Sequence, residues 1–201
     1  MTFRRGFKSE ANGYARDFRK ELELEPYSPL CPWTLAAKLE IPLMPLSIYR
    51  PTVPETVAYF ETVKGQKDLS AITLFERRFR WVVYNDAHHK KRQAADIAHE
   101  LAHCILQHPP KPPFNAEGSR HYDEDLEAEA NWLGPTLLVS EEAALMIVKS
   151  GMTLPEASDH YGVSMDLVRM RLNVTGAAKR VARRGAAYVG PPIVQSAGGN
   201  R

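Results

Sequence analysis

His99-Glu100-Leu101-Ala102-His103 reads H-E-x-x-H and lies within residues 91–107, whose apolar residues recur at helical spacing. Successive residues of a helix are turned by about 100°, so residues four apart lie one above the other on the same face. His99 and His103 can therefore bind one metal ion from the same side. Glu100 stands beside the first of them, placed to act on a water molecule at that ion. The pattern is typical of zinc hydrolases, chiefly metalloproteases.

The helix that carries this motif is predicted to be mostly buried against a small sheet. Its apolar residues surround the helix more fully than a surface helix requires. The run His108-Pro-Pro-Lys-Pro-Pro-Phe114 then ends it abruptly, because proline lacks the backbone donor that a helix needs. Ahead of the helix, residues 69–75 and 79–85 read as two strands that residues 76–78 would join as a hairpin.

Other elements follow from the same kinds of pattern. Residues 42–49 read as a strand interrupted by Pro45 and therefore near a sheet edge, whereas residues 55–64 fit either a helix or a strand. Residues 65–68 form a turn. In residues 154–172, the Gly162 turn and the capping Ser164 resemble a helix-turn-helix. Helices are also predicted over residues 10–24, 33–40, 123–138 and 141–149.

A catalytic zinc site takes three protein ligands and leaves one position open, so a third ligand is needed. Glu127 lies 24 residues after His103, with a proline-rich reversal between them, so a second helix can pack across the first. Asn131 is one turn beyond Glu127, where it can hydrogen-bond to the ligands. Glu129 points about 200° away and is a poorer candidate. Glu124, one turn before Glu127, stays open as an alternative.

In such a site Glu100 is expected to be the general base. Zinc lowers the pKa of a bound water to about 7. Glu100 would accept its proton and pass it to the leaving amine, a transfer that contributes typically ~10²–10⁴-fold. We interpret Asp96 as a helix-surface charge and Cys104 as a small packing residue. The sequence singles out no donor for the developing oxyanion; the candidates are Tyr84, His88, His89, His121 and Tyr122.

The composition is that of an ordinary globular protein and argues against a disulfide-rich, membrane-spanning or secreted protein. The chain has 201 residues, 44% of them hydrophobic and 25% charged, and a formal net charge of +2, which demands no acidic partner. Its 2 cysteines, Cys31 and Cys104, are too few for a disulfide framework. No apolar stretch approaches membrane-spanning length, and the N-terminus lacks the apolar run of a signal peptide. We therefore expect a cytoplasmic protein.

Taken together, four segments resemble the ImmA/IrrE family of metallo-endopeptidases. They are Trp81-Val-Val-Tyr-Asn85, residues 92–106 around the motif, residues 127–138 beginning Glu-Ala-Glu-Ala-Asn, and residues 162–172. The resemblance implies a compact, gluzincin-like fold and a zinc ion held by His99, His103 and a downstream glutamate that maps onto Glu127. It also implies cleavage or inactivation of a helix-turn-helix repressor, as in mobile elements, phages or stress responses.

Two features depart from the family pattern. Trp132-Leu-Gly-Pro135 stands where the family usually reads Phe-Ala-Ala-x, so Pro135 should kink or break the helix about two turns after Glu127. The chain also lacks an obvious second domain of the kind that acts as a sensor in some members. Regulation would then come from a partner or from exposure of the substrate.

Three alternatives remain open. Residues 154–172 could bind DNA, with phosphate contacts from Arg169, Arg171, Lys179, Arg180, Arg183 and Arg184. The zinc fold could instead dock a repressor without cutting it, or hydrolyse something other than a peptide. Because paired helices commonly form core packing and basic tails are commonly solvated, nucleic acid is the less favoured partner.

The sequence thus predicts an α+β, zincin-like fold in which a small antiparallel or mixed sheet packs on the motif helix. Glu100 would be catalytic, and zinc would be bound by His99, His103 and Glu127. The predicted organisation is an N-terminal helical segment (1–29), a metallopeptidase domain (30–150), a helix-turn-helix-like subdomain (151–185) and a flexible tail (186–201). The predicted partner is a helix-turn-helix repressor encoded nearby, as a protein substrate, with no membrane involved.

Overall fold

The computed structural model describes residues 3–77, 79–109 and 123–186, and these form a helix-rich α+β protein. The strands are β1 (Leu43–Pro45), β2 (Ala71–Glu76) and β3 (Phe79–Tyr84). The helices are α1 (Phe7–Glu21), α2 (Pro32–Lys38), the 3₁₀ helix η1 (Leu46–Tyr49), α3 (Pro54–Glu61), α4 (Gly65–Asp68), α5 (Lys90–Ile105), α6 (Glu124–Leu138), α7 (Glu141–Ser150), α8 (Leu154–Tyr161), α9 (Met165–Thr175) and α10 (Ala177–Ala186).

The three strands form one mixed sheet in the order β1-β3-β2. The predicted hairpin is confirmed, because β2 and β3 are antiparallel neighbours, with Thr73 opposite Val82. β1 pairs in parallel with β3 at the edge of the sheet, as the proline in its sequence indicates. The strand predicted over residues 42–49 was too long, since Pro45 ends β1 and a 3₁₀ helix follows.

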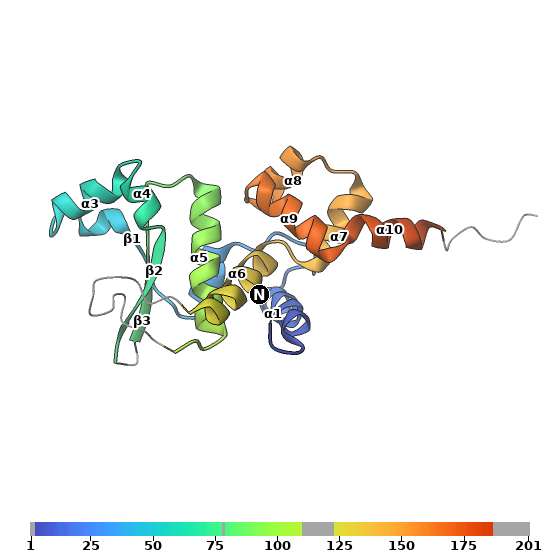
Figure 1. Ribbon diagram of the computed structural model, residues 1–201, viewed down its shortest axis with the longest axis horizontal. Coiled ribbons are helices and arrows are strands. Elements are labelled where there is room, and N and C mark those ends of the chain that lie inside the picture. Colours follow the sequence, from blue (N-terminus) through green and yellow to red (C-terminus); the bar gives the residue numbers. More distant parts are fainter. Residues whose placement is uncertain (1–2, 78, 110–122, 187–201) are drawn as a thin grey trace, which may run out of the picture.

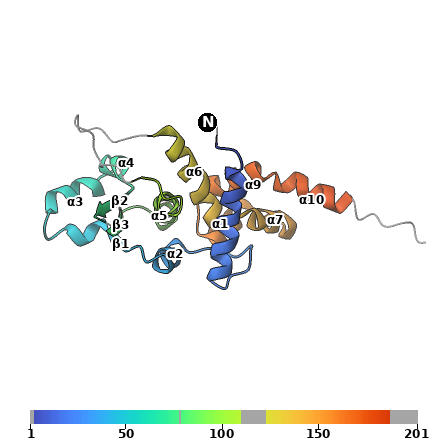
Figure 2. The same cartoon turned by 90° about the horizontal axis from the view of Figure 1, so that it is seen from below.

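The sheet lies between two helical layers (Figures 1 and 2). Val82 and Tyr84 share a core cluster with Ile97 and Leu101 of α5. Val83, the residue between them on β3, instead joins the cluster of η1 and α3 on the opposite face. This alternation follows from the period of two along a strand. Residues 55–64, which the sequence left undecided, are mainly helical, and the turn at residues 65–68 is a single helical turn.

Helix α6 crosses α5, and α1 packs on α6 on the side away from the sheet (Figure 2). The crossing is close because Gly134 has no side chain: a Cβ there would lie 3.1 Å from the backbone nitrogen of His99. Of the kink or break expected at Pro135, the break does not occur, since α6 continues to Leu138. The Thr136 hydroxyl donates a hydrogen bond to the Trp132 carbonyl and so satisfies one backbone acceptor in this turn.

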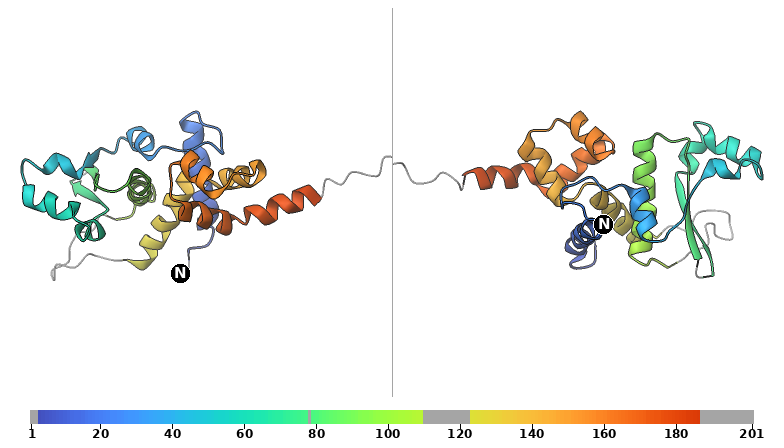
Figure 3. Two further views of the ribbon diagram at one scale, coloured as in Figure 1. Left: turned by 90° about the horizontal axis from the view of Figure 1, so that it is seen from above. Right: turned by 180° about the vertical axis from the view of Figure 1, so that it is seen from behind.

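Helices α7 to α10 form the C-terminal end of the described chain (Figures 1 and 3). The α8–α9 pair matches the predicted helix-turn-helix: Gly162, with a φ of 64°, ends α8, and the Ser164 side chain caps α9. α10 packs against α7, where Arg180 pairs with Glu141, and its far end extends beyond the other helices. The predicted flexible tail lies almost wholly outside the described residues. Within them, no helix is long and apolar enough to cross a membrane.

Candidate metal site

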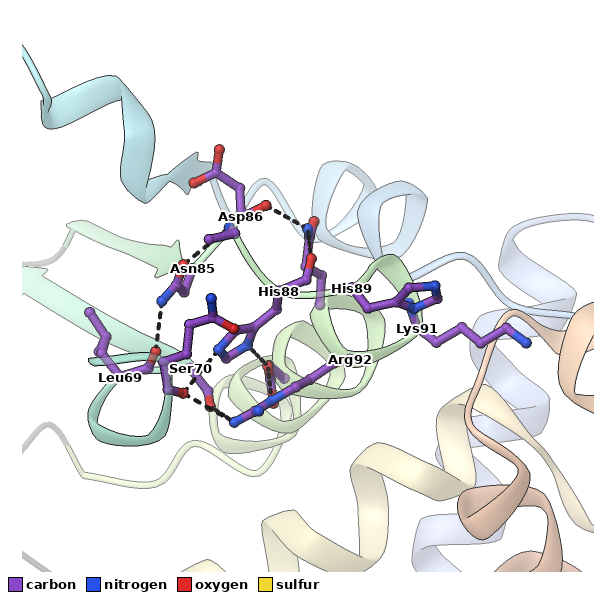
Figure 4. A network of polar contacts seen from close by, with 12 residues as sticks. Leu69, Ser70, Asn85, Asp86, His88, His89, Lys91 and Arg92 are labelled. Atoms are coloured by element: carbon purple, nitrogen blue, oxygen red, sulfur yellow. Dashed lines mark hydrogen bonds and ion pairs between the residues drawn. The ribbon is translucent and has the colours of Figure 1, made fainter. Parts of the chain in front are cut away.

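The start of helix α5 is fixed by a network of buried polar groups (Figure 4). The Asn85 side chain donates to the carbonyls of Phe60 and Leu69 at 2.8 and 3.1 Å. His88, whose side chain is fully buried, lies between the Asp96 carboxylate at 3.1 Å and the Gln66 carbonyl at 3.0 Å. These contacts tie α5 to the sheet and to α4 before the motif is reached. The helix therefore presents His99 and His103 from a rigid support.

The structure brings His99 and His103 of α5 together with Glu127 of α6. The two Nε2 atoms of His99 and His103 are 3.1 Å apart. The Glu127 carboxylate spans both rings, with Oε2 at 3.3 Å from His99 Nε2 and Oε1 at 3.5 Å from His103 Nε2. Among the described residues, these three form a group that could hold a metal ion. Between 20% and 26% of each side chain is exposed, so the group is reachable from solvent.

The spacing of these three side chains is close to that of zinc ligands. Zn–N and Zn–O bonds of ~2.0–2.2 Å in a tetrahedron place neighbouring ligand atoms about 3.3–3.5 Å apart. The two imidazole nitrogens, 3.1 Å apart, are slightly closer than this, whereas Glu127 approaches them at 3.3 Å through Oε2 and at 3.5 Å through Oε1. Two imidazoles and one carboxylate are also an established donor set for catalytic zinc, with a fourth position free for water. The donor set therefore fits zinc, and its spacing is close to the one that zinc requires.

The charge of the group also suits a cation. Hydrogen bonds from His103 and then from His99 hold the pKa of Glu127 far below its usual range, so this carboxylate is ionised at neutral pH. Burial lowers the pKa of His99, but the Glu127 hydrogen bond and the charges of Glu100, Glu127 and Asp96 outweigh it, so the net shift is upward. A bound metal would replace that proton as the positive partner of the carboxylate.

The Glu100 side chain contacts strand β2. The Thr73 hydroxyl donates a 2.5 Å hydrogen bond to Glu100 Oε2. One carboxylate oxygen is thus held by the sheet. Glu100 is half-buried, so part of this carboxylate is exposed to solvent. Thr73 could not be identified from the sequence, because its contact with Glu100 depends on which face of the strand meets α5.

A second contact of His103 was also missed from the sequence. His103 Nδ1 lies 2.8 Å from Nδ1 of His108, the residue just before the prolines. His108 Nε2 lies 3.3 Å from the Glu129 carboxylate, which accepts a 2.9 Å hydrogen bond from Arg4. Burial lowers the pKa of His108 against the opposing effect of Glu129, so the ring is neutral at pH 7. Glu129, a poorer ligand candidate, instead lies behind the ligands.

Several other candidates do not join the group. Glu124 is exposed in the first turn of α6. Asn131 was expected to hydrogen-bond to the ligands, but it is exposed and no such bond forms among the described residues, because its side chain lies on the solvent side of α6. Asp96 binds His88 and Arg92 rather than a ligand. Cys104 is buried in the core cluster, as expected.

The oxyanion candidates within the described residues have other partners. Tyr84 is buried against Trp33 in the sheet core. The ring of His88 is held by Asp96 and Gln66, and His89 caps the start of α5. His121 and Tyr122 lie outside the described residues. The structure therefore assigns no oxyanion donor among Tyr84, His88 and His89.

The suggested DNA contacts in residues 154–172 are weakened by the structure. Arg171 is buried, and its Nε donates to the Val139 carbonyl at 2.8 Å, so it cannot reach a phosphate. Arg169 forms an ion pair with Asp166, which would itself repel DNA from the start of α9. The Lys91 ammonium binds Asp159 and Ser158 and so ties α8 to α5. This helix pair is thus part of the packed body.

Comparison with known proteins identifies the family. A comparison with curated proteins finds no match, and neither does a comparison with solved structures. The family model Peptidase_M78, described as the IrrE N-terminal-like domain, matches residues 57–173, which is more than half of the chain and includes His99, Glu100, His103 and Glu127. The chain therefore belongs to the Peptidase_M78 family of IrrE N-terminal-like domains, as the resemblance to ImmA/IrrE proteins had indicated.

Proposed function

We propose that the chain is a zinc-dependent metallo-endopeptidase with a zincin-like fold, and that Glu100 is its general base. The observation that carries the proposal is the convergence of His99, His103 and Glu127 at separations of 3.1 to 3.5 Å. Glu100 follows the first of these residues on the same helix. Membership of a peptidase family supports hydrolysis of a peptide bond over other hydrolyses.

The chain's own residues supply positioning and proton transfer. A zinc ion held by His99, His103 and Glu127 would supply a Lewis acid that polarises a peptide carbonyl and acidifies water. Glu100 accepts a proton from the attacking water and returns it to the leaving amine nitrogen. The hydrogen bond from Thr73 leaves one oxygen of Glu100 for that transfer.

Strand β2 gives a place for an extended peptide. It lies at the edge of the described sheet and pairs on one side with β3. A peptide that added to the edge of β2 where no described strand pairs would run beside Thr73, whose hydroxyl contacts Glu100. We infer a protein substrate with an accessible extended segment. The resemblance to ImmA/IrrE proteins favours a helix-turn-helix repressor encoded nearby.

The test is co-incubation of the purified chain with that repressor, together with metal analysis. We expect one zinc ion per chain and cleavage of the repressor. Glu100→Gln should keep zinc and lose cleavage, whereas the double change His99→Ala/His103→Ala should lose both. Unaltered zinc content in the double variant would refute the ligand assignment.

The same variants separate the alternatives. A repressor-docking protein would bind the repressor and leave it intact in both the wild type and Glu100→Gln. A DNA-binding protein would show salt-dependent duplex binding that survives Glu100→Gln. Either result, with intact repressor in the wild-type reaction, would contradict the peptidase proposal.

A further inference from the structure

A chain of polar contacts runs from the ligand His103 away from the metal site. His103 Nδ1 lies 2.8 Å from His108 Nδ1, and His108 Nε2 lies 3.3 Å from Glu129 Oε2. Only 7% of the His108 side chain and 14% of the Glu129 side chain are exposed. These are therefore sheltered contacts, where a hydrogen bond is less weakened by water than at the surface.

With a metal bound at His103 Nε2, the contacts fit one arrangement of protons. A ligand imidazole must offer the lone pair of Nε2 to the metal, so neutral His103 carries its proton on Nδ1. That proton is donated to His108 Nδ1, which must then be the unprotonated nitrogen of its ring. His108 consequently carries its own proton on Nε2 and donates it to the Glu129 carboxylate. Each ring thus fixes the tautomer of the next.

The N-terminal segment contacts Glu129, the last residue in this series of polar contacts. Arg4 Nε donates to Glu129 Oε1 at 2.9 Å, and the two terminal nitrogens of Arg4 donate to both oxygens of Glu10 at 2.6 and 2.9 Å. Arg4 and Glu10 precede the region matched by the family model, residues 57–173. A part of the chain outside the matched region therefore supports a carboxylate behind the ligands.

We propose that His108 is a positioning residue that holds His103 in the tautomer and orientation needed to bind zinc, with Glu129 and Arg4 fixing His108 in turn. This inference rests on the proposed zinc site. Partners of this kind, one step behind a metal ligand, typically change metal affinity by ~10–100-fold when removed. The same range is expected for His108.

The test compares two substitutions of similar size at His108. Asn places an acceptor oxygen where His108 Nδ1 stands, whereas Leu places a methyl group there. We expect His108→Leu to weaken zinc binding by about 10–100-fold in competition with a chromogenic chelator, and His108→Asn to recover most of that loss. The visible absorption spectrum of the Co²⁺-loaded protein should change in the Leu variant and stay close to the wild type in the Asn variant.

Matched controls separate positioning from folding. His160→Leu removes an exposed histidine of α8 and should leave zinc affinity unchanged. Arg4→Met and Arg16→Met remove arginines of similar side-chain exposure, 50% and 48%, so neither should unfold the chain. Arg4→Met should nevertheless weaken zinc binding several-fold, while Arg16→Met should not. These surface variants keep the inference testable even where His108→Leu fails to fold.

The zinc measurements can distinguish failure of the His108 proposal from failure of the proposed function. Wild-type protein that binds no zinc would overturn both proposals. Wild-type protein that binds zinc, together with wild-type affinity and Co²⁺ spectrum in folded His108→Leu, would overturn this one alone. Equal zinc affinities for Arg4→Met and Arg16→Met would show that the N-terminal segment does not help to position His108.

Discussion

Thr73 is expected to position the proposed general base. Its hydroxyl donates a 2.5 Å hydrogen bond to Glu100 Oε2 from the face of β2 that meets α5. A hydrogen bond to a charged group is worth ~1.5–3 kcal/mol. Thr73→Val, which keeps the shape of the side chain, should therefore lower kcat/KM for repressor cleavage about 10- to 100-fold. Zinc affinity should not change, because Thr73 does not contact the ligand group.

Thr73→Ser is the matched control, since it keeps the hydroxyl and removes a methyl group. We expect its kcat/KM to stay within a few-fold of the wild type. Cleavage by Thr73→Val at the wild-type rate would show that the sheet does not orient Glu100. Comparison of zinc content across the three proteins separates this effect from metal loss.

The crossing of α5 and α6 depends on Gly134. A Cβ at this position would lie 3.1 Å from the His99 nitrogen and 3.2 Å from the backbone carbon and oxygen of Ala98. Backbone atoms cannot swing aside, so Gly134→Ala must push the two helices apart. Overpacking of this kind costs ~1–3 kcal/mol. We expect lower stability in urea unfolding and weaker zinc binding, because α6 carries Glu127 and α5 carries His99.

Gly13→Ala is the control for this substitution. Gly13 lies within α1, and a Cβ there would meet nothing within 4 Å. Since alanine favours a helix over glycine by ~0.5–1 kcal/mol, this variant should be slightly more stable, with unchanged zinc affinity. If Gly134→Ala behaved like Gly13→Ala, close helix approach would not set the position of Glu127.

Local patterns predicted most of the elements and pointed to the three side chains that the structure brings together. Once residues 91–107 are helical, the spacing of H-E-x-x-H places His99 and His103 on one face. The period of a second helix favoured Glu127 over Glu129 and left Glu124 open. The hairpin and the cap at Ser164 are also local features. Each of these depends on contacts within a few residues, which is why the sequence was sufficient.

The parts that the sequence did not predict depend on how elements meet. The parallel pairing of β1 with β3 and the contact of Thr73 with Glu100 follow from packing between distant segments. The role of His108 depends on its ring rotation and on Glu129, 21 residues further along the chain. The helix period predicted that Glu129 points away from His99 and His103. The helix period could not show that Arg4 and His108 contact Glu129 there.

Two buried arginines, one from α1 and one from α9, bind backbone carbonyls at the C-terminal end of α6. Arg19 of α1 is fully buried and donates to the carbonyls of Ser28 and Leu137 at 2.9 Å. Arg171 of α9 donates to the carbonyl of Val139 at 2.8 Å. Unpaired carbonyls at a helix end attract positive charge. The helix that carries Glu127 is thus held from both the N-terminal helix and the C-terminal helices.

This junction should dominate the stability of the whole chain. Burial lowers the pKa of Arg19 to about 10, so the guanidinium stays charged at pH 7. Arg19→Met should lower the free energy of unfolding by at least about 2 kcal/mol, because the buried acceptors it leaves cost ~1–3 kcal/mol each. Arg16→Met, which removes an exposed ion pair of the same helix with Glu142, should change it by less than about 1 kcal/mol. Urea unfolding followed by circular dichroism measures both. Equal midpoints would show that α1 is a dispensable addition to the matched domain, whereas a large loss for Arg19→Met alone would show that α1 and the family domain fold as one unit.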